Sequence, residues 1–310
     1  MLFRSQPDGT PYPDANAMGR ALIEAADTVG IRLTLLDTAY LSSSVYGDPP
    51  LQEQRRFADA SIETWADRIA GLEGSEKARI GVAAHSVRAL SPTQLETVVE
   101  VGQAIDGPVH VHASEQPSEN EECLRAHGVT PVGLLADTGF LGPQTTVVHG
   151  THVTEADIEL LASSGSGVCF CPTTEADLGD GIGPATEYAA AGVPLTLGSD
   201  SNTVTDILEE ASRLELHDRL RLGRRGLHSP AALLEAATWN GARSLGWEAG
   251  RIAPGYFADL VSLDTQSLEL AGTPADLPSI TMSATRASVQ MVIVGGNEVD
   301  LPFPSYEEHQ

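Results

Sequence analysis

The 310-residue sequence lacks any apolar stretch approaching the ~20 residues that a membrane-spanning helix needs. Its start, MLFRSQPDGTPYPD, also lacks an apolar segment of signal-peptide length. These absences predict a cytoplasmic protein without a membrane as a partner.

Positive charge is scarce. The chain has 18 Lys and Arg against 43 Asp and Glu, a net charge of −25, and Lys77 is its single lysine. Such a surface repels nucleic acid and anionic membranes, so neither is expected as a partner. It also repels anionic substrates at long range, and a site that binds one must therefore supply its own arginine.

Cysteine is rare too. The three cysteines are Cys123, Cys169 and Cys171, and the last two alternate along the apolar segment VCFCP. An odd number favours buried thiols in a reducing compartment over disulfides. A metal-binding Cys169–Cys171 pair is left open, although CxC without further ligands at the usual spacing is weak evidence.

Nucleotide-binding motifs are missing: no GxGxxG follows the first predicted strand, and GxxxxGK[ST] does not occur. What is present is an alternation of short apolar strands with helical patterns, which predicts a parallel α/β architecture. Helices are expected at 91–105, at 154–165 with Thr154 and Asp157 in a capping box, and at 205–220. The expected strands are 31–40, 79–87, 108–114, 145–150, 167–172 and 193–200.

Polar residues end several of these strands, where a (β/α)₈ TIM-type barrel keeps its active site. We therefore predict a barrel, incomplete because six strands are found and a closed barrel takes eight. From about residue 250 the pattern changes to β segments at 250–264 and 287–299, separated by a loop at 265–285. The prediction is a partial barrel over residues 1–248 and a small C-terminal β domain over 249–310.

The segment VHVHASEQ (109–116) contains the first candidate metal-binding and catalytic residues. In a strand His110 and His112 point to one face and the valines to the other. His85, His149 and Asp200 lie at the ends of other strands, and Glu115 follows just after His112. Imidazole and carboxylate groups that meet at one end of a barrel suit a divalent metal such as zinc, which lowers the pKa of a coordinated water to about 7. Glu115 is placed to carry the proton of that water.

Each of these residues also has a structural interpretation. A strand-end histidine is often simply hydrogen-bonded, and Asp200 could cap the helix that follows it. His110 is expected to line the same interior as His112 without being a ligand. His127 and His152 are expected in loops or at the surface.

Several motifs together resemble the amidohydrolase superfamily and, within its deaminase branch, the formimidoylglutamate deiminases. The resemblance rests on the following segments: PDGTPY (7–12), HSVRAL (85–90), HVHASEQ (110–116), VVHGTHVT (147–154), CPTTEADLGDGIGP (171–184), GSDSN (198–202) and GRIAPGYFADLVSLD (250–264). It implies one divalent metal, zinc, with His112 and Asp200 as ligands, and Glu115, His149 and Asp200 as catalytic residues. It also implies that Arg88, with His85 beside it, anchors a substrate carboxylate.

The implied reaction is hydrolytic deamination of N-formimidoyl-L-glutamate, a small substrate with two carboxylates, to N-formyl-L-glutamate and ammonia. The resemblance also requires an HxH metal pair ahead of PDGTPY, and the chain has almost nothing there. Either the start lies inside a longer protein, or the chain is a catalytically inactive homologue. A deaminase of a nucleobase is a third alternative. An open barrel exposes strand edges and is expected to be poorly soluble, and a homodimer is left open.

Overall fold

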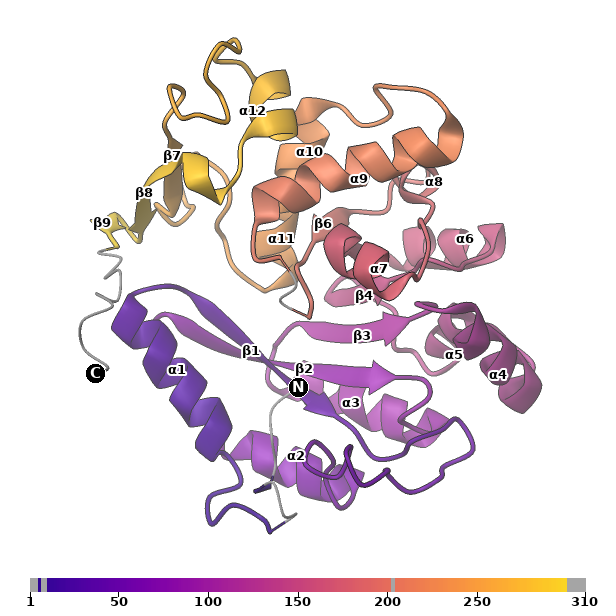
Figure 1. Cartoon of the computed structure of the whole chain (residues 1–310). Coiled ribbons are helices and arrows are strands. Elements are labelled where there is room, and N and C mark those ends of the chain that lie inside the picture. The colour runs from indigo at the N-terminus through magenta and orange to yellow at the C-terminus, as the bar shows by residue number, and fades with distance from the viewer. Residues whose placement is uncertain (1–4, 7–9, 202–203, 300–310) are drawn as a thin grey trace.

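A computed structural model describes residues 5–6, 10–201 and 204–299. Residues 7–9 of PDGTPY, Asn202 of GSDSN and residues 300–310 of the predicted second domain lie outside the described residues. In the described part, six parallel strands form one sheet (Figure 1). They are β1 (Leu33–Ala39), β2 (Ala78–Ser86), β3 (Val109–Ala113), β4 (Thr145–His149), β5 (Gly167–Phe170) and β6 (Leu195–Leu197).

The strands lie in the sheet in their chain order, β1 to β6. This is the order of a barrel, because a doubly wound open sheet reverses its strand order at a switch point. The predicted α/β fold with six of eight barrel strands is confirmed. The predicted strand ranges match within a few residues, except that β6 is much shorter than 193–200.

Helices cover the outer face of the sheet, where α3 packs on β2 and β3 and α9 and α10 pack on β6 (Figure 1). The predicted capping box at Thr154 begins α6, and a second capping box, which was not predicted, begins α3 at Ser91. The described helices are α1 (Ala17–Val29), α2 (Ile62–Ala70), α3 (Pro92–Ala104), α4 (Pro117–His127), α5 (Pro131–Asp137), α6 (Glu155–Ser164), α7 (Pro172–Leu178), α8 (Ala185–Ala190), α9 (Ile207–Leu222), α10 (Pro230–Ala237), α11 (Trp239–Ser244) and α12 (Leu277–Ser283). None of them is long and apolar enough to cross a membrane.

The core lies between the sheet and these helices. Val109 and Val111 are buried among the outer-face residues, while His110 and His112 occupy the opposite face of β3, as the alternation predicts. Gly102 on α3 permits a close approach, because a Cβ at that position would lie 2.6 Å from Cγ2 of Val109. The buried valines fix which face of β3 is turned inward, and so they hold its histidines in the barrel interior.

The C-terminal region forms a small antiparallel sheet of β7 (Leu260–Leu263), β8 (Val289–Val294) and β9 (Asn297–Glu298). The ion pair between Arg32 Nε and Asp259 Oδ2, at 2.7 Å, ties this sheet to the segment just before β1. Two sequence-based expectations are wrong here: residues 250–259 are not a strand, and 265–285 is not only loop, because it contains α12. Asp276 caps α12 by accepting the Ser279 N–H, a start signal within the segment DLPS. The predicted domain boundary between residues 248 and 249 stays a prediction.

Candidate metal and catalytic site

The predicted site residues lie at one end of the sheet, where the strands end. His85 and His112 are the penultimate residues of β2 and β3, and His149 is the last residue of β4. Arg88 follows β2, Glu115 follows β3 and Asp200 follows β6. This is the carboxyl end of the strands, where barrel enzymes carry their active sites.

The backbone is strained at this end. His149 has a φ of 72° and Asp200 a φ of 47°, values in the left-handed region that side-chain-bearing residues rarely adopt. Such conformations cost roughly 1–3 kcal/mol each and cluster at functional sites. The next residue must be Gly150, because a Cβ there would lie 2.6 Å from the Tyr188 hydroxyl, which donates to the Gly150 carbonyl oxygen.

His149 is the centre of the cluster. Its Nε2 lies 3.7 Å from Oε1 of Glu115 and 3.7 Å from Oδ2 of Asp200, and its Nδ1–H donates to Oε1 of Glu175 at 3.3 Å. Burial lowers the pKa of His149, but the hydrogen bond with Glu175 and the charges of Glu115 and Asp200 outweigh it and raise that pKa to about 9. These carboxylates therefore make a site that favours positive charge.

Glu175 was missed by the sequence analysis. It lies on α7, in the CPTTEADLGDG stretch, is 2% exposed and also accepts the backbone N–H of Cys171 at 2.8 Å. A glutamate four residues after the end of a strand, in a segment already singled out, was the available signal. Nothing in the sequence alone connects it with β4.

His112 lies beside His149, with the two rings stacked and their centroids 5.7 Å apart. Its Nδ1–H donates to the His85 carbonyl oxygen at 2.8 Å, an arrangement that leaves Nε2 as the lone-pair nitrogen. Burial and the neighbouring His149 lower the pKa of His112, which favours the neutral, ligating form. His85 packs edge-on against Tyr40, and burial, with His112 and Arg88 nearby, lowers its pKa to about 3.

Arg88 is joined to the cluster through Glu115. Nη2 of Arg88 lies 4.0 Å from Oε2 of Glu115, and the arginine side chain is 39% exposed. Nε of Arg88 is buried without a hydrogen-bond partner in the described structure. Burial raises the pKa of Glu115. The Arg88 guanidinium thus forms a long ion pair with the Glu115 carboxylate, which also faces His149, and its buried Nε–H has no acceptor in the described structure.

A divalent cation fits the donors at this end. Among the described residues, one group of three or more possible ligands lies within 4.8 Å of one another: His149, Cys171 and Asp200. The nitrogen, sulfur and oxygen of these side chains are donors that zinc accepts. His112 is not in that group, so the predicted ligand pair of His112 and Asp200 stays a prediction. The cysteines are free, with Cys123 and Cys171 buried and Cys169 partly buried.

The alternative interpretations can also be compared with the structure. Asp206, not Asp200, caps α9. Nε2 of His110 hydrogen-bonds to the Ser244 carbonyl oxygen at 2.8 Å, a structural role inside the barrel. Nε2 of His152 hydrogen-bonds to the Asp180 carbonyl oxygen at 2.7 Å. Asp200 is therefore free of the capping role that competed with metal binding.

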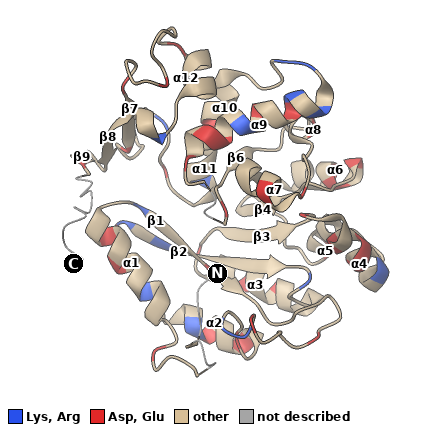
Figure 2. Cartoon of the chain, viewed as in Figure 1, with Lys and Arg blue, Asp and Glu red and all other residues tan. Residues whose placement is uncertain are grey.

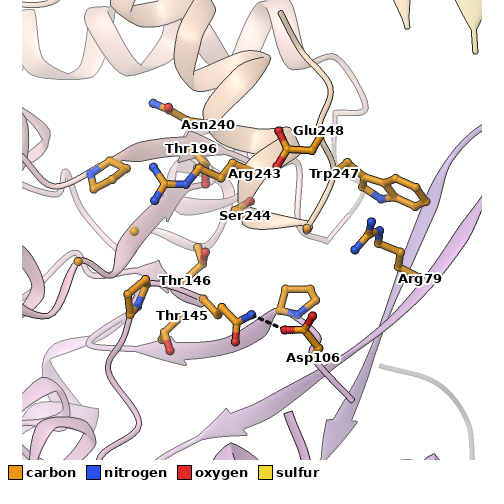
Figure 3. Close-up of a pocket in the computed structure, with 17 residues that line it drawn as sticks. Arg79, Asp106, Thr145, Thr146, Thr196, Asn240, Arg243, Ser244, Trp247 and Glu248 are labelled. Atoms are coloured by element: carbon orange, nitrogen blue, oxygen red, sulfur yellow. Dashed lines mark hydrogen bonds between the residues drawn. The ribbon is translucent and has the colours of Figure 1, made fainter. Parts of the chain in front are cut away.

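A cavity at the opposite end of the strands involves none of the predicted site residues (Figure 3). Arg79, Thr145 and Gly167, at or near the starts of their strands, line it together with Arg243 and Trp247. The guanidinium of Arg79 stacks on the Trp247 ring at 4.7 Å. In barrels this end serves stability rather than catalysis.

The charged residues are unevenly distributed between the strands and the elements around them. Acidic and basic residues lie mainly on the helices and loops, and β3 carries none (Figure 2).

Comparison with known proteins gives deaminases that act on different substrates, among them formimidoylglutamate deiminase, 5-methylthioadenosine/S-adenosylhomocysteine deaminase and 8-oxoguanine deaminase. The chain is 36% identical over 279 residues to formimidoylglutamate deiminase from Pseudomonas aeruginosa, a match that covers 87% of this chain and 61% of that protein. Across the curated relatives, the chain spans between about half and two thirds of their length.

Solved structures agree on the fold. A crystal structure of an amidohydrolase from Brucella melitensis matches with a TM-score of 0.87 and 35% identity, covering 96% of this chain and 68% of that chain. An adenosine deaminase from Xanthomonas campestris with bound zinc matches with a TM-score of 0.77 and 25% identity, covering 90% of this chain and 63% of that one. The model of the amidohydrolase family matches residues 9–299, nearly the whole described chain. The chain belongs to the amidohydrolase family.

Proposed function

We propose that this chain carries the substrate-binding and proton-transfer groups of a metal-dependent deaminase acting on N-formimidoyl-L-glutamate. The observation that carries the proposal is the placement of Arg88, whose Nη2 lies 4.0 Å from the Glu115 carboxylate, which in turn faces His149. A carboxylate anchor beside hydrolytic groups suits an acidic substrate. A neutral nucleobase has no use for such an anchor.

The reaction replaces the terminal C=NH of the formimidoyl group by C=O. Water adds to the formimidoyl carbon, the terminal nitrogen takes up the protons, and ammonia leaves to give N-formyl-L-glutamate. His112 and Asp200 would hold a divalent cation, zinc, which when bound would supply the acidity that makes water nucleophilic at neutral pH. Because the chain is shorter than its relatives, the activity is proposed for the protein to which these residues belong.

Glu115 is the proton carrier. It lies between Arg88 and His149, and its raised pKa suits a group that accepts a proton from water and gives it to the departing nitrogen. In its protonated form, His149 stabilises the negative charge that develops on the oxygen added to the formimidoyl carbon. Arg88 binds a carboxylate of the glutamate portion and holds the formimidoyl carbon near these groups.

The test measures ammonia release by the zinc-loaded chain from N-formimidoyl-L-glutamate, with adenosine as the comparison substrate and Glu115→Gln as the inactive control. Calorimetric binding of N-formyl-L-glutamate is measured in parallel. Release from the formimidoyl substrate, or binding of the product N-formyl-L-glutamate that depends on Arg88, is the expected result. Turnover of adenosine alone, or neither turnover nor binding, would reject the proposal.

A further inference from the structure

We propose that the exposed face of α9 binds α9 of a second copy of this chain, with the two helices antiparallel around a two-fold axis. Helix α9 belongs to the outer layer of helices, where it packs on α7, α10 and α12 (Figure 1). The inference does not depend on the proposed function.

The first argument is a line of exposed side chains along α9. The helix buries Ala211, Leu214 and Asp218 against the rest of the chain. Four residues on the opposite face are spaced by four, three and four positions, which places them in one row along the helix. They are Glu209, Arg213, Leu216 and Leu220. This spacing is that of the seam along which two helices pack in a coiled coil.

Two leucines of this row face solvent. Leu220 is 78% exposed and Leu216 is 37% exposed, and they lie one helical turn apart. Both are near the middle of the segment 209–225. A second helix laid along the row would cover both leucines and remove their apolar surface from water.

The second argument is the charge along the same segment. Glu209 lies in the first turn of α9, where Oε1 pairs with Nη2 of Arg213 at 2.9 Å. Arg224 and Arg225 follow directly after the helix and are exposed, and neither pairs with a carboxylate in the part of the chain that the structure describes. Figure 2 shows acidic residues toward the start of α9 and basic residues at its end and in the loop that follows.

This distribution of charge makes the surface complementary to itself in one orientation. An antiparallel pair with its axis near residue 218 places Leu216 opposite the partner's Leu220, and brings Glu209 to the end of the partner's helix, within side-chain reach of the partner's Arg225. A two-fold axis repeats each contact, so both ends of the pair are neutralised. A parallel pair would instead set like charges against each other.

The helix dipoles favour the same orientation, because the negative carboxyl end of each helix lies beside the positive amino end of the other. One pair of helices is a small contact compared with most stable interfaces. We therefore expect a dimer that depends on protein concentration rather than an obligate one.

Sedimentation velocity of the full chain over a range of concentrations measures the association. We expect a monomer–dimer equilibrium in the wild type, and an increase of the dissociation constant by about tenfold or more in Leu220→Arg, which puts a charge into the apolar centre of the contact. Because Leu220 is exposed, this variant should fold normally. Leu124→Arg, an exposed change on α4, is the matched control and should associate like the wild type.

An exchange of charges tests the orientation. The double variant Arg224→Glu with Arg225→Glu should weaken the dimer by about tenfold, since exposed ion pairs are lost at both ends of the contact. Adding Glu209→Arg to the double variant should restore the affinity, because the pairs form again with their signs exchanged. Hydrogen–deuterium exchange of the wild type at low and high concentration tests the contact without a variant, and added protection is expected at 207–229.

A chain that stays monomeric up to about 100 μM would overturn the proposal. Association that is unaffected by Leu220→Arg, or protection only outside 207–229, would place the contact on another surface and overturn it as well. If Glu209→Arg does not restore the double variant, the antiparallel arrangement is wrong.

Discussion

Glu175 and His149 are joined by a hydrogen bond of 3.3 Å from Nδ1–H to Oε1, with both side chains nearly inaccessible to solvent. The carboxylate comes from α7 and the imidazole from the end of β4. A carboxylate behind a histidine fixes the ring's orientation and stabilises its charged form, so Glu175 favours the protonated form of His149.

We therefore expect Glu175→Gln to lower the pKa of His149, because the amide keeps the shape of the side chain but loses the charge that raises this pKa. Titration of the His149 ring in the metal-free chain, followed by nuclear magnetic resonance, measures the pKa. Asp177→Asn, an exposed change on the same helix, is the matched control and should leave the pKa of His149 unchanged. Equal pKa values of His149 in the two variants would show that Glu175 does not support its protonated form.

The sequence was sufficient to place His85, His112, His149 and Asp200 at one end of a parallel sheet, because apolar strand patterns locate strand ends. It was not sufficient to find Glu175 or the proximity of Cys171 to Asp200. Those relationships depend on α7 beginning immediately after β5 and on the Thr174–Ser199 hydrogen bond, neither of which has a periodic signal. Helix α12 was missed for a different reason, since a seven-residue helix shows too little periodicity.

The role of Arg88 is tested by Arg88→Met, which keeps much of the side-chain length and removes the guanidinium. We expect KM for N-formimidoyl-L-glutamate to rise by about 10- to 100-fold with little change in kcat, because hydrogen bonds to a charged group are worth about 1.5–3 kcal/mol and this one is made in ground and transition states alike. If turnover is absent, the dissociation constant of N-formyl-L-glutamate should rise by a similar factor. Arg125→Met, an exposed change on α4, is the control. An unaltered KM and dissociation constant in Arg88→Met would eliminate the anchor.

A buried ion-pair network supports the first strand. Arg68 on α2 contacts Asp37 of β1 at 2.5 Å and Asp59 at 3.1 Å, and the Trp65 indole N–H donates to Asp37. Arg68→Met leaves two buried carboxylates without their cation, so we expect a loss of about 3–5 kcal/mol in the free energy of unfolding.

Urea denaturation followed by tryptophan fluorescence measures this loss. The matched control is Arg20→Met, whose partner Asp14 is about half exposed, and which should cost less than about 1 kcal/mol. Similar small losses in both variants would mean that the network contributes no more than a surface ion pair.

The buried carboxyl group of Glu119 should make the free energy of unfolding depend on pH. It is 2% exposed, one carboxylate oxygen accepts the Glu115 N–H, and the other has no hydrogen-bond partner in the described structure. Burial raises the pKa of Glu119 to about 7, from 4.5 in the unfolded chain. Because the folded-state pKa is the higher one, the stabilisation is fully present below pH 4.5 and is lost as the pH rises through 7.

Glu119→Gln imitates the protonated carboxyl and removes this titration. At one pK unit per 1.36 kcal/mol, the wild-type chain should lose about 2–3 kcal/mol more than the variant between pH 5 and pH 8. Urea denaturation of the metal-free proteins at these two values of pH gives the difference. Glu121→Gln, exposed on the same helix, is the control and should follow the wild type. Parallel pH profiles for the wild type and Glu119→Gln would show that Glu119 is ionised in the folded chain, with Arg88 as the nearby charge that compensates for its burial.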